Sequence, residues 1–600
     1  MTNQNKALAT LVLAMAVATA SAQTSASSTD TPKKVHHHHP AATERVEHRP
    51  SVESQIEDLK NQMDSQKGEI DTLKQQLTDR DAQLQQAQQA AAAAQAAAQQ
   101  AQQAANQEQQ QITESNSAVT SLQSSVTDLK ASSSALATSV QTQTAEVKKA
   151  LESPEVIHYK GITLSPAGSF IEAATVYRSA ATGGGINTPL TSIPLQDSGQ
   201  AQESEFFGSG RQSRLALKAT GKLDNATMTA YYEMDWLGAG TTSNNNQSNS
   251  YLLRQRQLWA RAAFLSGWTV SGGQMWSLTT ETTKGLDNGT EILPGTIDPQ
   301  YTAGFVWNRQ YGFRVAKDFG DKMWVGASLE NDQALPGGTA PTNEFLGTAG
   351  VGGGLYNLNA NYSFNLAPEV VAKMAFEPGW GHWELFGVAR FFRDRVYPSA
   401  TSAAGAYNDT SVGGGIGAGF RAPMANKKIT VGLKGLYGDG VGRMGDSTIA
   451  DLTFRTDGTI ALLHAFSALS TVELNPTKRL NIYLNYGGDY VGRNIQDADK
   501  SGYGLYSASM SGCTTEALPT GSYGPGTTGT CKGNNKDVQE FTSGYWYNFY
   551  NGPKGRFRYG LQYSYIERNL WSGAGGPLNP NGGAKGTDNV FETSMRYYVP

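Results

Sequence analysis

The chain has 600 residues, and its 48 Lys and Arg against 52 Asp and Glu give a formal net charge of −4. This balance does not indicate a basic surface for nucleic acid, so no nucleic-acid partner is expected. Mean hydropathy is −0.43. Beyond the N-terminal leader the sequence lacks an apolar run of the roughly 18 residues that a membrane helix needs, which excludes helical membrane spans.

The N-terminus has the pattern of an export signal. Lys6 precedes an apolar run over residues 7–20, and Ala20-Ser21-Ala22 is a small-residue cleavage site. This predicts a signal peptide over residues 1–22 and a mature chain that begins at Gln23. Residues 23–50 are rich in Ser, Thr, Pro and Lys and are expected to form a flexible, disordered leader.

The leader contains a run of four histidines, His36 to His39, followed by His48. Neutral imidazoles bind Zn, Ni or Cu, which makes a metal site one interpretation. A spacer without a metal function is the simpler one. We therefore expect no bound metal and no cofactor.

Residues 51–153 hold one heptad register, with apolar residues at its a and d positions. The a positions include Met63, Ile70, Leu77, Leu84, Ile112, Val119, Val126 and Val140, and the d positions include Leu59, Leu73, Leu122, Leu129 and Leu136. An isolated surface helix would drift out of this phase, so the pattern predicts a coiled coil roughly 150 Å long, and hence an oligomer. The alternative is a disordered tract rich in Gln and Ala.

The rest of the chain, residues 157–600, shows two-residue periodicity. At its end, Phe591, Met595 and Tyr597 share one face, while Glu592 and Arg596 share the other. The same alternation recurs over residues 228–236, 323–330, 480–486 and 557–565. One apolar, aromatic face and one polar face predict a transmembrane β-barrel of antiparallel strands.

The connections between these strands fall into two classes. Short turns are expected near 223–225, 265–267, 320–321, 378–381, 425–426, 475–477 and 551–554, where Gly, Asn and Pro favour turns. Long loops are expected at 180–210, 238–250, 279–304, 332–368, 398–410, 442–458, 495–537 and 572–587. Seven turns and eight loops require sixteen strands. Segment 351–367 reads as either strand or loop, and an even strand number favours a loop.

Export and a barrel together predict the outer membrane, with lipids against the aromatic face. Pro154 ends the helix just before the first strand, which places the coiled coil in the periplasm. A sixteen-stranded barrel leaves an aqueous lumen, so passage of solutes is the expected function.

Several cations are predicted to line that lumen. Arg214 and Lys218 lie opposite the apolar Leu215 and Leu217, and Arg254 shares a face with Arg256. An Arg that faces lipid at mid-depth costs about 2–4 kcal/mol, so these side chains should face inward and select anions. Arg314 and Arg390 are expected to join them, with Lys434, Arg558 and Arg596 as further candidates. The alternative is that these cations pair with Glu233, Asp235, Glu330 and Asp489 or sit at the rims.

Loop 279–304 is the candidate constriction. It contains Asp287, Glu291 and Asp298 among glycines, and folded inward it would oppose these acids to the arginines. Another long loop contains Cys513 and Cys531, the two cysteines of the chain, which we expect to form a disulfide in an oxidising compartment. A metal site there would need more ligands nearby.

Four short motifs complete the pattern: Arg254-Gln255-Arg256, then residues 273–277 (GQMWS), 367–371 (APEVV) and 379–382 (GWGH). With the modules above, over residues 51–600, the chain resembles the DcaP-like family of trimeric outer-membrane porins. The resemblance implies a homotrimer, a periplasmic coiled coil and uptake of small anionic solutes such as dicarboxylates. The chain departs from the family in its longer rod, and in Gln257, where a His followed by a small and an aromatic residue is expected.

Two other classes remain open. Some outer-membrane barrels are hydrolases, but His158, His382 and His464 lie in no recognisable Ser-His-acid motif, so we expect no enzyme. A structural tether or adhesin is the second alternative, because a rod of this length is able to reach peptidoglycan.

Overall fold

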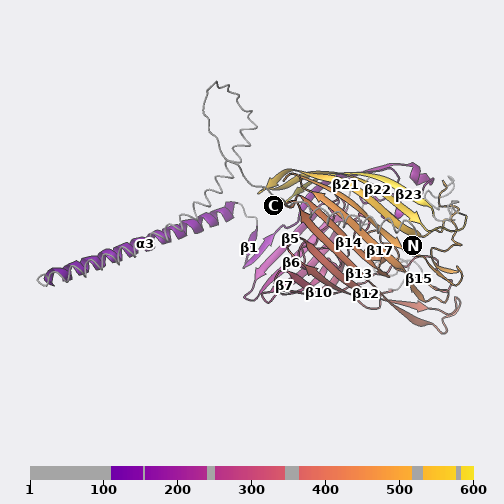
Figure 1. Ribbon diagram of the computed structural model, residues 1–600, viewed down its shortest axis with the longest axis horizontal. Helices are drawn as coiled ribbons and strands as arrows, with labels where there is room; N and C mark the ends of the chain where they lie inside the picture. The colour runs from indigo at the N-terminus through magenta and orange to yellow at the C-terminus, as the bar shows by residue number, and fades with distance from the viewer. Residues whose placement is uncertain (1–109, 153–155, 240–250, 345–363, 517–530, 576–582) are drawn as a thin grey trace, which may run out of the picture. The chain divides into compact units, whose positions relative to one another are not determined.

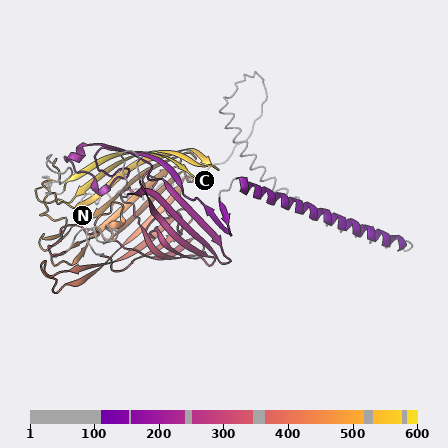
Figure 2. The same cartoon turned by 180° about the vertical axis from the view of Figure 1, so that it is seen from behind.

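The computed structural model describes residues 110–152, 156–239, 251–344, 364–516, 531–575 and 583–600. The predicted signal peptide, the leader with His36 to His39, and the coiled-coil segment up to residue 109 lie outside these ranges. The chain separates into two units at residues 153 and 154, and each unit is considered by itself. The first contains helix α3 and the second the barrel (Figures 1 and 2).

Helix α3, Gln110–Glu152, lies within the segment predicted to form a coiled coil. Its heptad residues Leu122, Val126, Leu129 and Leu136 are 60–75% exposed in the single chain. Such a stripe has no partner within its own helix, as expected for one strand of a coiled coil whose seam is formed between chains. Association of the seams stays a prediction. Among the described helices, none is long and apolar enough to cross a membrane.

The second unit is a closed barrel of sixteen antiparallel strands, as predicted. The first strand consists of β2 (Ile162–Ser165) and β3 (Phe170–Arg178), and the second of β4 (Glu205–Ser209) and β5 (Arg214–Lys222). The others are β6 (Ala226–Gly238), β7 (Leu252–Phe264), β8 (Trp268–Trp276), β9 (Arg309–Asp318), β10 (Met323–Glu330), β11 (Glu369–Phe376), β12 (His382–Val396), β13 (Tyr407–Met424), β14 (Ile429–Asp439), β17 (His464–Leu474), β18 (Leu480–Val491), β21 (Asn535–Gly552), β22 (Gly555–Leu570) and β23 (Lys585–Tyr598). Pairing of β23 with β3, from Val590↔Arg178 to Tyr598↔Phe170, closes the barrel.

Smaller elements decorate the barrel. Strand β1 (Ile157–Tyr159) pairs with β2 alone, and two hairpins lie in the loops, β15 (Leu452–Phe454) with β16 (Ile460–Leu462) and β19 (Asn494–Gln496) with β20 (Ser501–Tyr503). The 3-10 helices are η1 (Leu190–Ser192), η2 (Gly199–Gln202) and η3 (Gly442–Met444).

Residue alternation divides each strand between the two faces of the wall. In β23, Phe591 and Met595 are 48% and 46% exposed, whereas Glu592, Ser594 and Arg596 are at most 6% exposed. The apolar side chains therefore point outward and the polar ones inward, which is the arrangement that a lipid-facing barrel requires.

All seven predicted short turns connect neighbouring strands. Gly267 and Gly320 have φ of 82° and 74°, a conformation that glycine adopts without steric cost. The predicted bounds of the long loops are less accurate. Strand β4 lies inside predicted loop 180–210, β13 begins within 398–410, and β23 begins within 572–587. Each of these strands thus extends into a segment that the sequence predicted as loop. Of segment 351–367, residues up to 363 lie outside the described ranges, and Asn365 forms one bridge with Phe392.

Candidate pore constriction

The segment between β8 and β9, residues 277–308, crosses the interior of the barrel; we call it the interior loop. Its backbone N–H groups donate to side chains from well-separated strands. Thr282 N lies 2.8 Å from Glu384 Oε1 of β12, and Ile297 N lies 2.7 Å from Gln562 Oε1 of β22. Ala303 N donates to Glu540 of β21 at 2.8 Å. The wall thus satisfies the backbone of a buried loop, which would otherwise carry unpaired polar groups.

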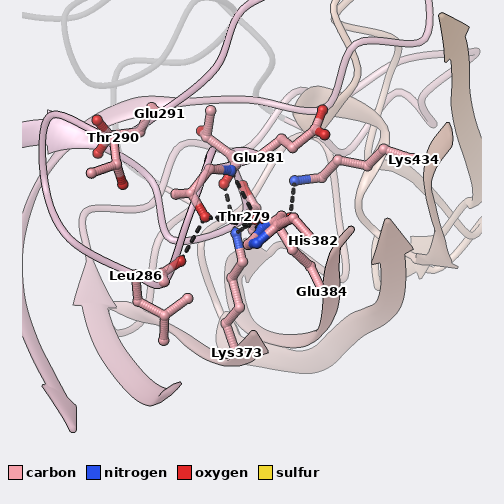
Figure 3. Close-up of polar contacts among 12 residues, drawn as sticks. Thr279, Glu281, Leu286, Thr290, Glu291, Lys373, His382, Glu384 and Lys434 are labelled. Atoms are coloured by element: carbon pink, nitrogen blue, oxygen red, sulfur yellow. Dashed lines mark hydrogen bonds and ion pairs between the residues drawn. The ribbon is translucent and has the colours of Figure 1, made fainter. Parts of the chain in front are cut away.

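One carboxylate, Glu384, anchors the first limb of this loop, which contains Thr280 and Thr282 (Figure 3). Lys373 Nζ lies 2.6 Å from Glu384 Oε1, and Lys434 Nζ lies 3.1 Å from Oε2. His382 Nε2 is 3.0 Å from the same carboxylate, and Lys373 also donates to the carbonyl of Thr280 at 2.7 Å. Two buried ammonium groups share Glu384, so this part of the loop is held by charge-assisted hydrogen bonds.

A cavity of about 370 Å³ lies between the wall and the second limb of the interior loop, which contains Ile297 and Asp298. Its charged lining residues come from seven elements of the barrel unit. They are Arg214, Asp235, Arg254, Arg256, Asp298, Arg309, Asp446 and Arg596. We call this space the arginine cavity.

Arg254 and Arg256 reach it through a β-bulge in β7. Glu233 pairs with Gln257, but the next residue, Met234, pairs with Gln255, so Arg256 is the extra residue of the bulge. Arg256 Nε lies 2.6 Å from Glu233 Oε1, and Arg254 Nη2 lies 2.8 Å from Asp235 Oδ2. The predicted inward placement of both arginines is correct, and so is the alternative that they pair with carboxylates.

Two other arginines have no such partner. Within the described chain, neither Arg214 nor Arg309 lies within ion-pair distance of a carboxylate. The guanidinium of Arg309 lies against two neighbouring indoles, 5.1 Å from the ring centre of Trp276 and 5.4 Å from that of Trp307. That of Arg214 lies 5.2 Å from the ring of Phe170. Aromatic contact holds these cations without neutralising them.

Two acids face the arginines across the cavity. Asp298 accepts a 2.6 Å hydrogen bond from Asn187 Nδ2, and burial raises the pKa of its carboxyl to about 6. Asp446 accepts from Trp307 Nε1 at 2.5 Å, and burial raises its pKa well above the ordinary value. Both groups lie in loops rather than in the membrane-spanning strands.

The remaining predicted residues do not meet at the arginine cavity. Arg390 is fully buried, with Nη2 2.5 Å from Asp332 and Nη1 2.8 Å from Asp451, so it holds loops rather than lining an open space. Arg314 is also buried; it donates to the carbonyl of Trp276 at 2.6 Å and lies 3.9 Å from Glu291. Both arginines were predicted to line an open pore. In the described chain they are instead buried and lie close to acidic side chains.

Lys218, Asp287 and Glu291 also lie outside this cavity. Lys218 is exposed and shares the inward parity of Arg214, and it pairs with Ser165 toward the end of the barrel that has short turns. Asp287 is 44% exposed and 3.7 Å from Arg261, and the Glu291 side chain is only 4% exposed. Of the three acids predicted for the constriction, Asp298 alone lines the arginine cavity, whereas Asp287 and Glu291 lie near other arginines.

The polar contacts near Glu384 include an arrangement that resembles a hydrolytic triad. Thr282 Oγ1 lies 3.3 Å from His382 Nε2, and His382 Nδ1 lies 2.6 Å from Glu377 Oε1. However, Thr282 and His382 are 2% and 4% exposed, so a substrate cannot approach the hydroxyl. The geometry serves to fix the interior loop.

Outside the barrel interior, Cys513 and Cys531 are joined by a disulfide with an S–S distance of 2.08 Å. It lies in a small apolar cluster with Leu195, Met510 and Leu570. The bond therefore ties the base of its loop to neighbouring loops.

Sequence reasoning missed three residues of the arginine cavity: Trp307, Arg309 and Asp446. Trp307 and Asp446 lie in loops, where alternation gives no information about facing. Arg309 is the first residue of β9. Arg309 lies an odd number of residues before Arg314, so alternation along β9 would place the two side chains on opposite faces. Only the contacts of Arg309 identify it as a residue of the cavity.

No protein-family model matches the sequence, and no curated protein is significantly similar to it. Solved structures are similar in fold. The outer-membrane channel DcaP of Acinetobacter baumannii has a TM-score of 0.51 and 13% identity, over 74% of this chain and 99% of that chain. OmpT of Vibrio cholerae (TM-score 0.38, 9% identity, 74% and 100% covered) and an anion-selective porin from Comamonas acidovorans (0.36, 11%, 73% and 98%) also match. The chain therefore shares the barrel fold of the DcaP channel.

Proposed function

We propose that the protein is an outer-membrane porin that admits small hydrophilic anions. The observation that carries the proposal is the arginine cavity, where Arg214, Arg254, Arg256, Arg309 and Arg596 meet the interior loop. Guanidinium groups form forked hydrogen bonds with carboxylates, and a ring of them lowers the entry barrier for anions.

The distribution of charge supports anions over cations. Arg254 and Arg256 are offset by Asp235 and Glu233, and Arg596 by Glu172 at 2.8 Å. Arg214 and Arg309 have no carboxylate within ion-pair distance in the described chain, and they are therefore the residues we assign to anion attraction.

Asp298 and Asp446 stand opposite the arginines, so their ionised forms would create a transverse field across the cavity. Such a field orients a solute with two separated charged groups, which fits dicarboxylate-like solutes. In this proposal the interior loop is the constriction loop, and Asp298 is its acid at the cavity.

The test is the reversal potential under a KCl gradient across planar bilayers that contain the purified protein. Arg309→Gln and Arg214→Gln should each lower the preference for chloride. Lys427→Gln, at an exposed turn, is the matched control and should leave the preference unchanged. Cation preference in the wild type, or no conductance, would contradict the proposal and favour a tether, an adhesin or a barrel hydrolase.

For the assembly we propose a homotrimer with its coiled coil, residues 51–153, in the periplasm. The exposed heptad residues of α3 support association through this seam. Leu129→Gln with Leu136→Gln should weaken it, measured as chains per particle by light scattering in detergent. A particle mass of one or two chains for the wild type would overturn the trimer.

The same rod is long enough to support a second role as a tether. Binding of the protein to purified peptidoglycan, lost in Leu129→Gln with Leu136→Gln, would favour tethering in addition to transport. The N-terminus of the mature protein, expected at Gln23, tests the proposed export route by mass spectrometry.

A further inference from the structure

Two arginines of β12 project from the outer wall of the barrel. Their neighbours Phe392, Asp394 and Val396 are at most 1% exposed and point inward. Because side chains alternate along a strand, Arg393 and Arg395 point outward. The register of β13 places Thr410 opposite Arg393 and Asn408 opposite Arg395, and both partners are exposed. We call these four residues the β12 arginine patch.

The patch lies directly beyond an apolar stretch of the same wall. Phe391 pairs with Val412, and Val412 and Ile416 are 69% and 70% exposed. Ten positions separate Trp383, at the short-turn end of β12, from Arg393. At about 3.3 Å per residue and a tilt of about 40°, this is a height of roughly 25 Å, the height of the apolar band of such barrels. Arg393 and Arg395 therefore lie at headgroup level on the side of the long loops.

Neither arginine is neutralised. Arg395 Nη1 donates to Asn408 Oδ1 at 3.1 Å, and in the described chain neither guanidinium has a carboxylate within ion-pair distance. The nearest acids face inward: Asp394 is 1% exposed, and Asp409 accepts from Ile460 N at 2.8 Å.

The outward cation of the C-terminal strands has a different environment. Lys585 of β23 lies 2.5 Å from Glu567 of β22. This outward cation thus has its own acid, whereas the β12 arginine patch offers two forked donors beside a hydroxyl and an amide. The contrast indicates a site that takes its negative charge from outside the chain.

We propose that the β12 arginine patch binds the phosphate of a phosphorylated lipid in the leaflet on the long-loop side. Guanidinium forks match phosphate oxygens, and Phe391, Val412 and Ile416 offer an apolar surface for the acyl chains of the same molecule. The proposal rests on the membrane location in the proposed function, but not on anion transport.

The test uses the full mature protein in detergent, with diphosphoryl lipid A as the probe and its phosphate-free form for comparison. Native mass spectrometry should show retention of the diphosphoryl lipid by the wild type. Arg393→Gln with Arg395→Gln should reduce retention by at least about fivefold, because both forks are lost. Lys585→Gln, whose lysine is already paired, is the control and should retain the lipid.

Equal retention by the double variant and the wild type would overturn the proposal, as would equal binding of the phosphate-free lipid. A change in the number of chains per particle without a change in lipid retention would instead assign the patch to contact between copies and also overturn it. Ion selectivity of the double variant should match the wild type. A failure here is therefore distinguishable from a failure of the porin proposal, which the arginine-cavity variants test.

Discussion

Trp307 of the interior loop and Asp446 of the loop after β14 are joined by a hydrogen bond of 2.5 Å between Nε1 and Oδ1. Their loops also meet through the backbone, with Trp307 N 3.1 Å from the carbonyl of Met444. Both residues line the arginine cavity and a second cavity of about 290 Å³. The pair therefore stands at the border between the two spaces, where two loops from different parts of the chain narrow the interior.

Once the pH exceeds the raised pKa of the Asp446 carboxyl, Asp446→Asn should raise the preference for chloride, because it then removes a negative charge while keeping an acceptor for Trp307. At about 7 Å in water one charge contributes about 0.6 kcal/mol, or roughly a threefold change in anion occupancy. Reversal potentials measured over a series of rising pH values follow the effect. Trp307→Phe, which keeps the carboxylate, should not raise chloride preference; an equal rise in both variants would assign the effect to loop movement.

Anion preference should depend on pH through Asp298. Its pKa is raised to about 6, so the carboxyl is ionised above that pH and neutral below it. As the pH falls through about 6, a negative charge disappears from the arginine cavity and chloride preference should increase. Asp298→Asn should lose the step in chloride preference near pH 6. A wild-type preference that falls on acidification would contradict the assignment.

Glu384→Gln should release the first limb of the interior loop. The substitution keeps the shape of the side chain but leaves Lys373 and Lys434 without their shared anion, a loss of about 3–5 kcal/mol for a buried pair. We expect a larger single-channel conductance and a lower thermal midpoint. Glu567→Gln is the control: Glu567 of β22 pairs with Lys585 of β23 at 2.5 Å, and neither residue belongs to the interior loop. Unchanged conductance in Glu384→Gln would show that the anchor is dispensable.

Variants of Arg390 and Arg309 should separate an effect on thermal stability from an effect on ion selectivity. Arg390→Leu leaves three carboxylates, Asp332, Glu369 and Asp451, without this cation, so we expect a loss of about 3–5 kcal/mol and no change in ion preference of protein that still folds. Arg309→Gln should do the reverse. Thermal unfolding followed by circular dichroism, together with reversal potentials, measures both. A large change in ion selectivity in Arg390→Leu would show that Arg390 acts on the permeating ions and contradict its assignment to stability.

The sequence by itself determined the barrel, its strand number, its seven short turns and the facing of most strand residues. These follow from local rules: alternation records which side of a strand meets lipid, as in Phe591 and Glu592, and Gly or Asn marks where the chain reverses. The heptad pattern likewise identified the segment in which α3 lies, although association of that helix is a property of more than one chain.

Tertiary structure alone decided which charges meet. Alternation predicted the same inward facing for Arg390 and Arg254. Only the fold places Asp332, Glu369 and Asp451 around Arg390 and sets Arg309 against two neighbouring indoles. The bulge at Arg256 and the inward paths of the loops containing Asp298 and Asp446 have no local signature, because they are stabilised by contacts between residues that are 23 to 265 positions apart in the sequence. Local periodicity therefore specifies the wall, whereas long-range contacts specify what stands inside it.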